Sequence, residues 1–196
     1  MLVKEFWQVD SASSQLGFTL SHLIVSEIQG RFATWGGQMI FDPDDVDRSQ
    51  IRVWIDVASI DTGSTERDAH LRSAEFLDVA RFPRAAFAST GLTIRQEGHA
   101  RLDGRLQLHG ITRNVALDLV TDRSWLDPNR RLHVAYVAHG TIDRQAFGLH
   151  WNQDLDVGGV VVGDKVQINA RIEMVRTAES VMVSERLQEG DPGPAS

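Results

Sequence analysis

The densest group of side chains that could do chemistry lies between residues 61 and 72. Its members are Asp61, Arg67, Asp68, His70 and Arg72. Opposite charges at this spacing form either an ion-paired network that fixes the local fold or the polar rim of an opening. The segment therefore has a structural function or a ligand-binding one, and the two can hold together.

His22 is a second candidate, because of the residues that precede it. It follows Leu16, Phe18 and Leu20 at every second position. In a strand this spacing points all four side chains to the same face, here an apolar one. A buried imidazole must pair its ring nitrogens or lose solvation. His22 is thus either a satisfied core histidine or a polar handle that orients the head group of a bound ligand.

Other patterns do not indicate catalysis or a metal site. The chain has no Cys, which excludes thiol catalysis, disulfides and thiolate zinc sites. It has no Gly-x-Ser-x-Gly sequence, and no Ser has a recognisable catalytic partner. The acidic run that begins at Asp42 has Asp47 and Val53 where a calcium loop requires Gly and Glu, and it is interpreted as a solvated turn. We predict no catalytic residue, no metal and no required cofactor.

Composition narrows the partners further. The 196 residues carry a formal net charge of −7, which argues against nucleic acid as a partner. No window approaches the roughly 18 apolar residues of a membrane span, so we expect no integral span. The first residues, Met1 to Gln8, lack the apolar core of about 7–15 residues found in a secretory signal, which predicts a cytoplasmic location.

Alternation of apolar and polar residues dominates the chain and predicts an all-β fold. Nine segments are expected to form strands, namely 14–23, 29–35, 37–41, 51–58, 85–94, 100–109, 115–119, 131–138 and 166–174. His109-Gly110 predicts a tight hairpin, and Gly36-Gly37 predicts a bulge that interrupts a strand. Many strands joined by short turns form a sandwich or a closed barrel.

Two segments do not alternate. Residues 62–82 are expected to form a short helical insertion over one end of the sheet, with Ser64 or Thr65 as its N-cap. Residues 177–196 form a separate C-terminal tail, with a short helix from Ala178 to Gln188 and a disordered Gly- and Pro-rich end. The domain boundaries are therefore placed at 1–176 for the folded domain and 177–196 for the tail.

Small residues in the inward-facing set predict free space inside the fold. They are Ala100, Gly104, Ala138, Gly140 and Ala170. An eight-stranded antiparallel barrel has an interior that side chains just fill or that holds one small ligand. A space walled by Leu, Val, Ile and Phe would suit an apolar chain.

Beyond these patterns, the sequence resembles the YceI-like family of lipocalin-shaped, polyisoprenoid-binding proteins. The resemblance covers roughly residues 5–175. It rests on Trp7-Gln8-Val9-Asp10, on 18–23 (FTLSHL), on Gly30-Arg31-Phe32 and Phe41-Asp42, on 59–63 (SIDTG), on 67–73 (RDAHLRS) and 76–79 (FLDV), on Phe82-Pro83, Phe87 and Ser89-Thr90, on 108–112 (LHGIT), on 143–152 (DRQAFGLHWN) and on the last strands, 157–173. So many spaced matches are more specific than any single motif.

This resemblance implies an extended antiparallel eight-stranded lipocalin-like barrel with a hydrophobic tunnel, and frequent homodimerisation. It implies a bound amphiphilic lipid, such as an isoprenoid quinone or a polyprenyl carrier, met by transient contact with a membrane face. We expect the lipid tail to lie among Phe18, Leu20, Phe32, Trp35, Phe76, Phe87, Leu106, Leu108, Tyr136 and Trp151. We expect the head group near His22, Arg67, His70 and Asn152.

The leading hypothesis is therefore non-catalytic binding, storage or transport of such a lipid. Two alternatives stay open. One is an enzyme that acts on a hydrophobic small molecule with His22 or His70 as the acid-base residue. The other is a packed interaction module whose interior is filled by side chains.

Overall fold

A computed structural model describes residues 4–22, 26–151 and 162–177. The strands are β1 Glu5–Val9, β2 Gln15–His22, β3 Ser26–Phe32, β4 Trp35–Phe41, β5 Gln50–Asp56, β6 Ile60–Asp61, β7 Arg84–Gln96, β8 His99–Leu108, β9 Ile111–Leu126, β10 Leu132–Asp143 and β11 Val162–Thr177. The helices are α1 Thr65–Arg72 and the 3-10 turns η1 Val46–Arg48, η2 Val57–Ser59 and η3 Arg144–Phe147. The proposed tail helix, 178–188, lies outside the described residues.

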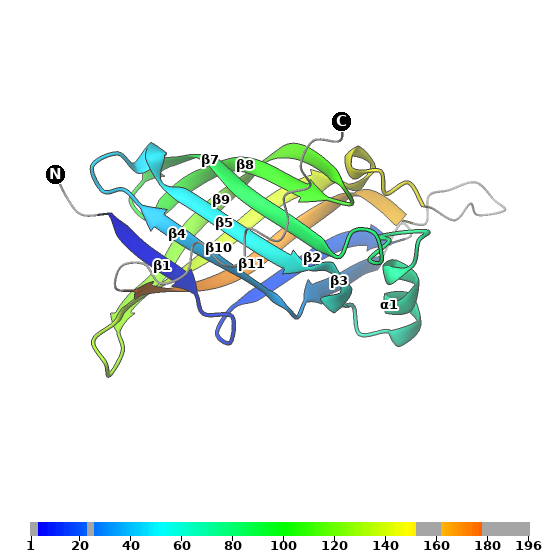
Figure 1. Ribbon diagram of the computed structural model, residues 1–196, viewed down its shortest axis with the longest axis horizontal. Helices are drawn as coiled ribbons and strands as arrows, with labels where there is room; N and C mark the ends of the chain where they lie inside the picture. Colours follow the sequence, from blue (N-terminus) through cyan, green and yellow to red (C-terminus); the bar gives the residue numbers. More distant parts are fainter. Residues whose placement is uncertain (1–3, 23–25, 152–161, 178–196) are drawn as a thin grey trace, which may run out of the picture.

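The strands close into an antiparallel barrel, as predicted (Figure 1). The closed ring runs β1-β4-β5-β7-β8-β9-β10-β11 and returns to β1 through the β1–β11 pairing. β2 and β3 continue the lines of β1 and β4, because β11 pairs with β1 along one part of its length and with β2 along another. β6 continues β5 in the same way by pairing with β3. The barrel therefore has eight strand positions around its ring, which we call staves. The first three staves are interrupted, since β1 and β2 share one, β3 and β4 share the second, and β5 and β6 share the third.

Alternation along each strand separates an apolar interior from a polar exterior. Trp7 and Met39 are buried, and they pair directly across β1 and β4. On β8, Leu102, Gly104 and Leu106 are buried, whereas Arg105 and Gln107 are exposed. The interior is thus built by the same period-two pattern that the sequence shows.

Turn chemistry sets the hairpins. The β8–β9 connection consists of His109 and Gly110 alone, both with positive φ (51° and 72°), which is the geometry of a two-residue type I′ hairpin. The hairpin expected here is confirmed. The expected bulge at Gly36-Gly37 is wrong, because both glycines lie inside β4 in unbroken register with Trp54 and Val53.

Glycine is needed at position 36 because of the side chain that packs against it. A Cβ atom at this position would lie 2.8 Å from the Trp54 indole, so the glycine lets the ring lie against the strand. Trp54 is 47% exposed on the outside of the barrel. The break in this stave falls after β3, at Ala33-Thr34.

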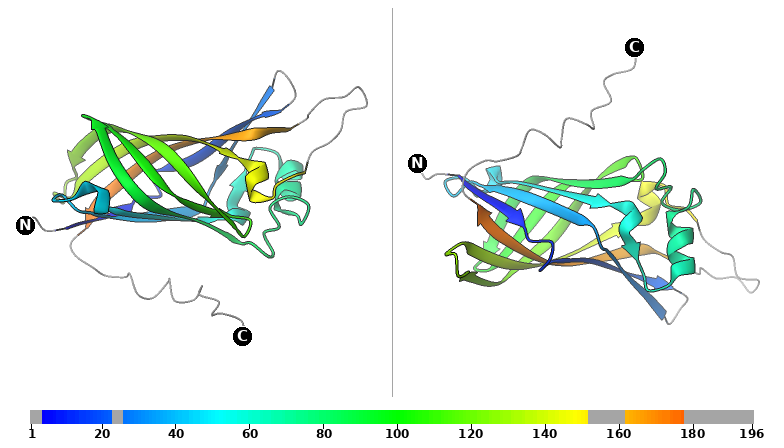
Figure 2. Two further views of the ribbon diagram at one scale, coloured as in Figure 1. Left: turned by 90° about the horizontal axis from the view of Figure 1, so that it is seen from above. Right: turned by 60° about the horizontal axis from the view of Figure 1, so that its bottom comes forward.

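α1 lies across one end of the barrel, as expected for the 62–82 insertion (Figure 2). The Ser64 hydroxyl accepts the backbone N–H of Arg67 at 3.4 Å and caps the helix. The helix ends at Arg72, and Ser73 is its C-cap. The insertion is therefore shorter as a helix than predicted, since residues 73–83 form turns.

Candidate functional site: a cavity inside the barrel

The barrel encloses a cavity of about 360 Å³. This volume is within the range typical of small-ligand sites. Side chains from all eight staves form its wall, and most are apolar. The central wall residues are Leu16, Trp35, Met39, Ile51, Val53, Ile55, Phe87, Leu92, Ala100, Leu102, Leu106, Val115, Leu117, Leu119, Ala138, Ile168, Ala170, Ile172 and Met174.

The two ends of the barrel differ. At the α1 end a buried cluster fills the interior, and its members Val57, Ile60, Leu77, Phe147 and Leu149 are each at most 5% exposed. None of these five lines the cavity.

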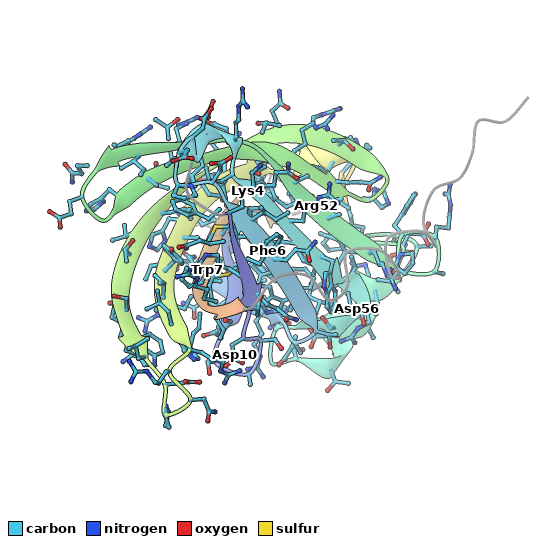
Figure 3. The ribbon with its side chains drawn as sticks, turned by 60° about the vertical axis from the view of Figure 1, so that its left-hand side comes forward. Lys4, Phe6, Trp7, Asp10, Arg52 and Asp56 are labelled. Carbon is cyan, nitrogen blue, oxygen red and sulfur yellow. The ribbon has the colours of Figure 1, made fainter. Side chains whose placement is uncertain are left out.

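β1, η1 and the β7–β8 hairpin lie at the opposite end of the barrel (Figure 1). The cavity reaches the surface there, because its wall includes exposed residues of that hairpin. There Ile94, which is 58% exposed, lines it beside Gln96, His99 and Thr121. We call this end the mouth, and Figure 3 brings it forward with Phe6 and Trp7 on opposite sides of β1. A chain-like ligand would therefore enter from the mouth and stop at the packed cluster.

Only some of the small inward residues leave space. Ala100, Ala138 and Ala170 line the cavity, and Ala138 pairs directly with Ala170 across β10 and β11. The room beside the two glycines is occupied by neighbours. A Cβ at Gly104 would lie 2.3 Å from the Phe87 ring, and one at Gly140 would lie 2.5 Å from Leu117.

The residues predicted to hold a lipid tail separate into two places. Trp35, Phe87, Leu106 and Tyr136 line the cavity. Phe18 and Phe32 pack together with ring centroids 5.8 Å apart, against the buried cluster that Leu108 also contacts. Leu20 lies in β2 opposite Val166. Phe76 and Trp151 are at the α1 end, 6.0 Å apart.

The residues predicted to hold a head group do not lie at the cavity. Asn152 lies outside the described residues, and for His22 the structure describes only its backbone, at the end of β2. Arg67 donates from Nε to the Thr62 hydroxyl and from its terminal nitrogen to the Thr62 carbonyl, each at 2.8 Å. His70 contacts the edge of Trp151, with centroids 4.6 Å apart. Their part in ligand binding stays a prediction.

The charged constellation between residues 61 and 72 forms a network that holds the barrel end together. Asp68, which is 6% exposed, accepts the N–H and the hydroxyl of Thr62. Arg72 donates to the carbonyls of Ala58 and Ile60. The N–H of Gly63 and the Arg31 guanidinium both lower the pKa of Asp61. These contacts fit the structural interpretation of the constellation.

Four polar residues that line the cavity near its mouth, Glu5, Gln96, His99 and Thr121, were not predicted from the sequence as binding residues. Tyr136, predicted as a tail contact, lies on the cavity wall. Burial first, and then the negative charge of Glu5, raise the pKa of the Tyr136 phenol. Glu5 is two positions from Trp7, so the same period-two rule that places Trp7 inside also indicates Glu5.

A further polar cluster lies away from the cavity, where the β9–β10 hairpin meets β11. His133 is 6% exposed and stacks on Trp125, and its Nδ1 is 2.8 Å from Glu173 Oε1. Its Nε2 is 3.4 Å from Asp127 Oδ2. The backbone N–H of Arg131, and then its guanidinium and His133, lower the pKa of Asp127 to about 2. Within the described ranges, no cluster of three or more His, Asp or Glu has the arrangement of a metal site.

A closed eight-stranded antiparallel barrel around an apolar cavity is the architecture of the barrels that have room for one small ligand. The chain belongs to the YceI-like family, since the sequence profile of the YceI-like domain matches residues 7–174. A UPF0312 protein of Serratia proteamaculans is 38% identical over 132 residues, which is 67% of this chain and 68% of that protein. One of Vibrio parahaemolyticus is 36% identical over 107 residues, and there the match spans 55% of this chain and 57% of the relative.

Solved structures show the same fold. Burkholderia cenocepacia BcnA superposes with a TM-score of 0.72 at 22% identity, over 84% of this chain and 98% of BcnA. A polyisoprenoid binding domain from Saccharophagus degradans superposes with a TM-score of 0.63 at 16% identity, over 87% and 98% of the two chains. Among the helices in the described part of this chain, none is long and apolar enough to cross a membrane.

Proposed function

We propose that this protein binds, stores or transports an amphiphilic lipid with an isoprenoid-type tail, and that it catalyses no reaction. The observation that carries the proposal is the apolar cavity of about 360 Å³ inside a closed barrel that opens at one end. The similarity to a polyisoprenoid binding domain supports the same ligand class. A polyprenyl lipid or an isoprenoid quinone has such a tail.

The energetics allow binding through the tail alone. Burial contributes about 0.8 kcal/mol for each methylene. Micromolar affinity corresponds to roughly 8 kcal/mol, and association has its own costs in entropy and ordering. Two to three well-buried isoprene units, with five carbon atoms each, contribute roughly 8–12 kcal/mol, which is of the size of the micromolar figure before those costs are subtracted. A wall of Leu, Ile, Val, Met and aromatic side chains gives no directional contact, so the tail sets affinity and leaves the identity of the ligand to its polar end.

The proposal is tested by extracting the protein, purified from its native host, with organic solvent and analysing the extract by mass spectrometry. We expect a stoichiometric amphiphile with an isoprenoid tail. A variant whose cavity is narrowed, Ala138→Leu, is the matched control and should release much less of it. Recovery of no amphiphile, together with no uptake of added quinone, would overturn the proposal.

The enzyme alternative predicts a different result. His70 is 3.2 Å from Glu75 and packs on Trp151, outside the cavity wall. A protein that turns over no hydrophobic substrate, and whose His70→Ala variant keeps its bound lipid, supports the binding function. Loss of turnover of a hydrophobic substrate with retained lipid would support the enzyme instead. Homodimerisation and a cytoplasmic location are part of the same proposal, and light scattering and cell fractionation test them.

A further inference from the structure

The cavity wall is apolar except near the mouth, where its polar residues gather. They are Glu5, Gln96, His99, Thr121 and Tyr136. Gln96, His99 and Thr121 are exposed at the rim, where water competes for their hydrogen bonds. Glu5 and Tyr136 are partly buried. These two side chains therefore dominate the polar contacts that a ligand meets once it is inside.

Glu5 is held in place but keeps free acceptor capacity. Its Oε2 accepts the indole N–H of Trp7 at 3.2 Å, and its Oε1 is 3.2 Å from the Arg176 guanidinium. A carboxylate has about four acceptor positions, so roughly half of them remain for a ligand. Trp7 is only 6% exposed and lines the cavity, which fixes the carboxylate against the wall.

Tyr136 provides the complementary group. Within the described residues its hydroxyl makes no hydrogen bond to the protein. Burial and the nearby charge of Glu5 raise the pKa of this phenol, so it stays protonated at neutral pH. It therefore offers a donor and an acceptor to whatever lies beside it.

The charge at the mouth excludes one class of head group. Among the described residues that line the cavity, none is Lys or Arg. Arg176 is already paired with Glu5. A phosphate or carboxylate placed here would face the Glu5 charge without a free cation, and like charges at short range are costly. A hydroxyl can donate to Glu5 and accept from Tyr136.

We propose that Glu5 and Tyr136 bind the polar end of the ligand and select amphiphiles that end in a neutral hydroxyl, an alcohol or a phenol, over those that end in phosphate or carboxylate. This inference rests on the proposed function, because it requires the tail to occupy the cavity. It moves the head group from the α1 end to the mouth.

The test uses three probes with one tail, namely farnesol, farnesyl methyl ether and farnesyl phosphate. Each is titrated into the full chain by calorimetry. The ether oxygen can accept from Tyr136 but cannot donate to Glu5, and the phosphate adds charge. We expect farnesol to bind about 10-fold more tightly than the ether, which lacks one charge-assisted hydrogen bond, and more tightly still than the phosphate.

Two variants assign the contacts. Glu5→Gln should weaken farnesol about 5- to 10-fold, leave the ether unchanged and strengthen the phosphate, since Arg176 is released. Tyr136→Phe should weaken farnesol and the ether alike. Thr93→Val, which is exposed on β7 and does not line the cavity, is the matched control and should change none of the three. Thermal unfolding of each variant checks that it folds.

The outcomes separate the two proposals. Equal affinities for the three probes in the unmodified protein, or an unchanged preference in the variants, would overturn the head-group inference and leave lipid binding in place. Binding of none of the probes would overturn both. If Glu5→Gln does not fold, the probe comparison in the unmodified protein and the Tyr136→Phe variant still decide the question.

Discussion

A larger side chain on the cavity wall should raise the free energy of unfolding and lower the affinity for a lipid tail. These two opposite effects together are the strongest test of the binding site. Ala138 and Ala170 pair side by side on β10 and β11, and both line the cavity. Ala138→Leu would place three additional carbon atoms in that space. The change keeps the strand apolar and adds no polar group that would need a partner.

The magnitudes follow from the volume exchanged. Three carbon atoms displace about three methylenes of a bound tail, each worth about 0.8 kcal/mol, so affinity should fall by roughly 50-fold. In the free protein the same atoms fill a cavity, which commonly adds about 0.5–2 kcal/mol to the free energy of unfolding. Urea denaturation followed by tryptophan fluorescence measures the second quantity, and calorimetric titration with farnesol measures the first.

A matched control lies on the outside of the wall. Ala86 is exposed on β7, beside the inward-facing Phe87, so Ala86→Leu adds the same atoms without entering the cavity. It should leave both quantities nearly unchanged. A loss of 1–3 kcal/mol in stability for Ala138→Leu would indicate overpacking and would refute the free space at this position. Unchanged affinity would refute tail binding inside the barrel.

Three further predictions concern the stability of the barrel. Arg144 is 2% exposed and makes five hydrogen bonds, four of them to backbone carbonyls. Arg144→Met should therefore lower the free energy of unfolding by about 3–5 kcal/mol in urea melts. A change below about 1 kcal/mol would contradict its structural role. Gly104→Ala should lower the free energy of unfolding by about 1–3 kcal/mol, because its Cβ would lie 2.3 Å from the Phe87 ring and 2.7 Å from the Ala88 carbonyl oxygen. Phe87→Leu in the same chain relieves only the ring contact, so the double variant should recover part of that loss in urea melts, and no recovery would refute the ring contact as a cause. The pKa of Asp127 is about 2 in the folded protein against 3.8 for the free side chain, so its stabilising effect is complete above pH 4 and is lost as pH falls from 4 to 2. Asp127→Asn should remove that part of the acid dependence in melts recorded between pH 2 and 6, and an identical pH profile would show that the ion pair with Arg131 contributes nothing.

The barrel itself could be predicted because its signal is local. Strand alternation depends on each residue and its neighbours two positions away, and the strands between Trp7 and Met174 follow it. The breaks in the first three staves could not be predicted in this way. Ala33 donates to the Ser59 carbonyl and Asp56 donates to the Thr34 carbonyl, each at 3.0 Å. These bonds join segments far apart in the sequence, and no local pattern encodes them.

The shape of the cavity was only partly predictable for a similar reason. A small inward residue leaves space only if no neighbour covers it. Gly104 lies under Phe87 from the adjacent strand, and Gly140 lies under Leu117. Ala138 and Ala170 face each other's small side chains, so the wall recedes there. Which case applies depends on the cross-strand register, and a list of inward positions does not contain that information.

The head-group prediction shows how charge should be interpreted in such a barrel. A dense run of charges, such as residues 61–72, lies where the staves end and leave carbonyls without sheet partners. Arg72 and Arg67 donate to those carbonyls, so their guanidinium groups hold the end of the barrel together and are not free to bind a head group. A single acid in phase with apolar residues, such as Glu5, is different, because the strand carries it inward at a cost in solvation. An inward carboxylate is tolerated only where partners offset its lost solvation. The Arg176 guanidinium and the Trp7 indole N–H offset part of that loss for Glu5. A hydroxyl on the ligand would provide the rest, which makes the isolated inward acid, and not the charged cluster, the residue to examine first.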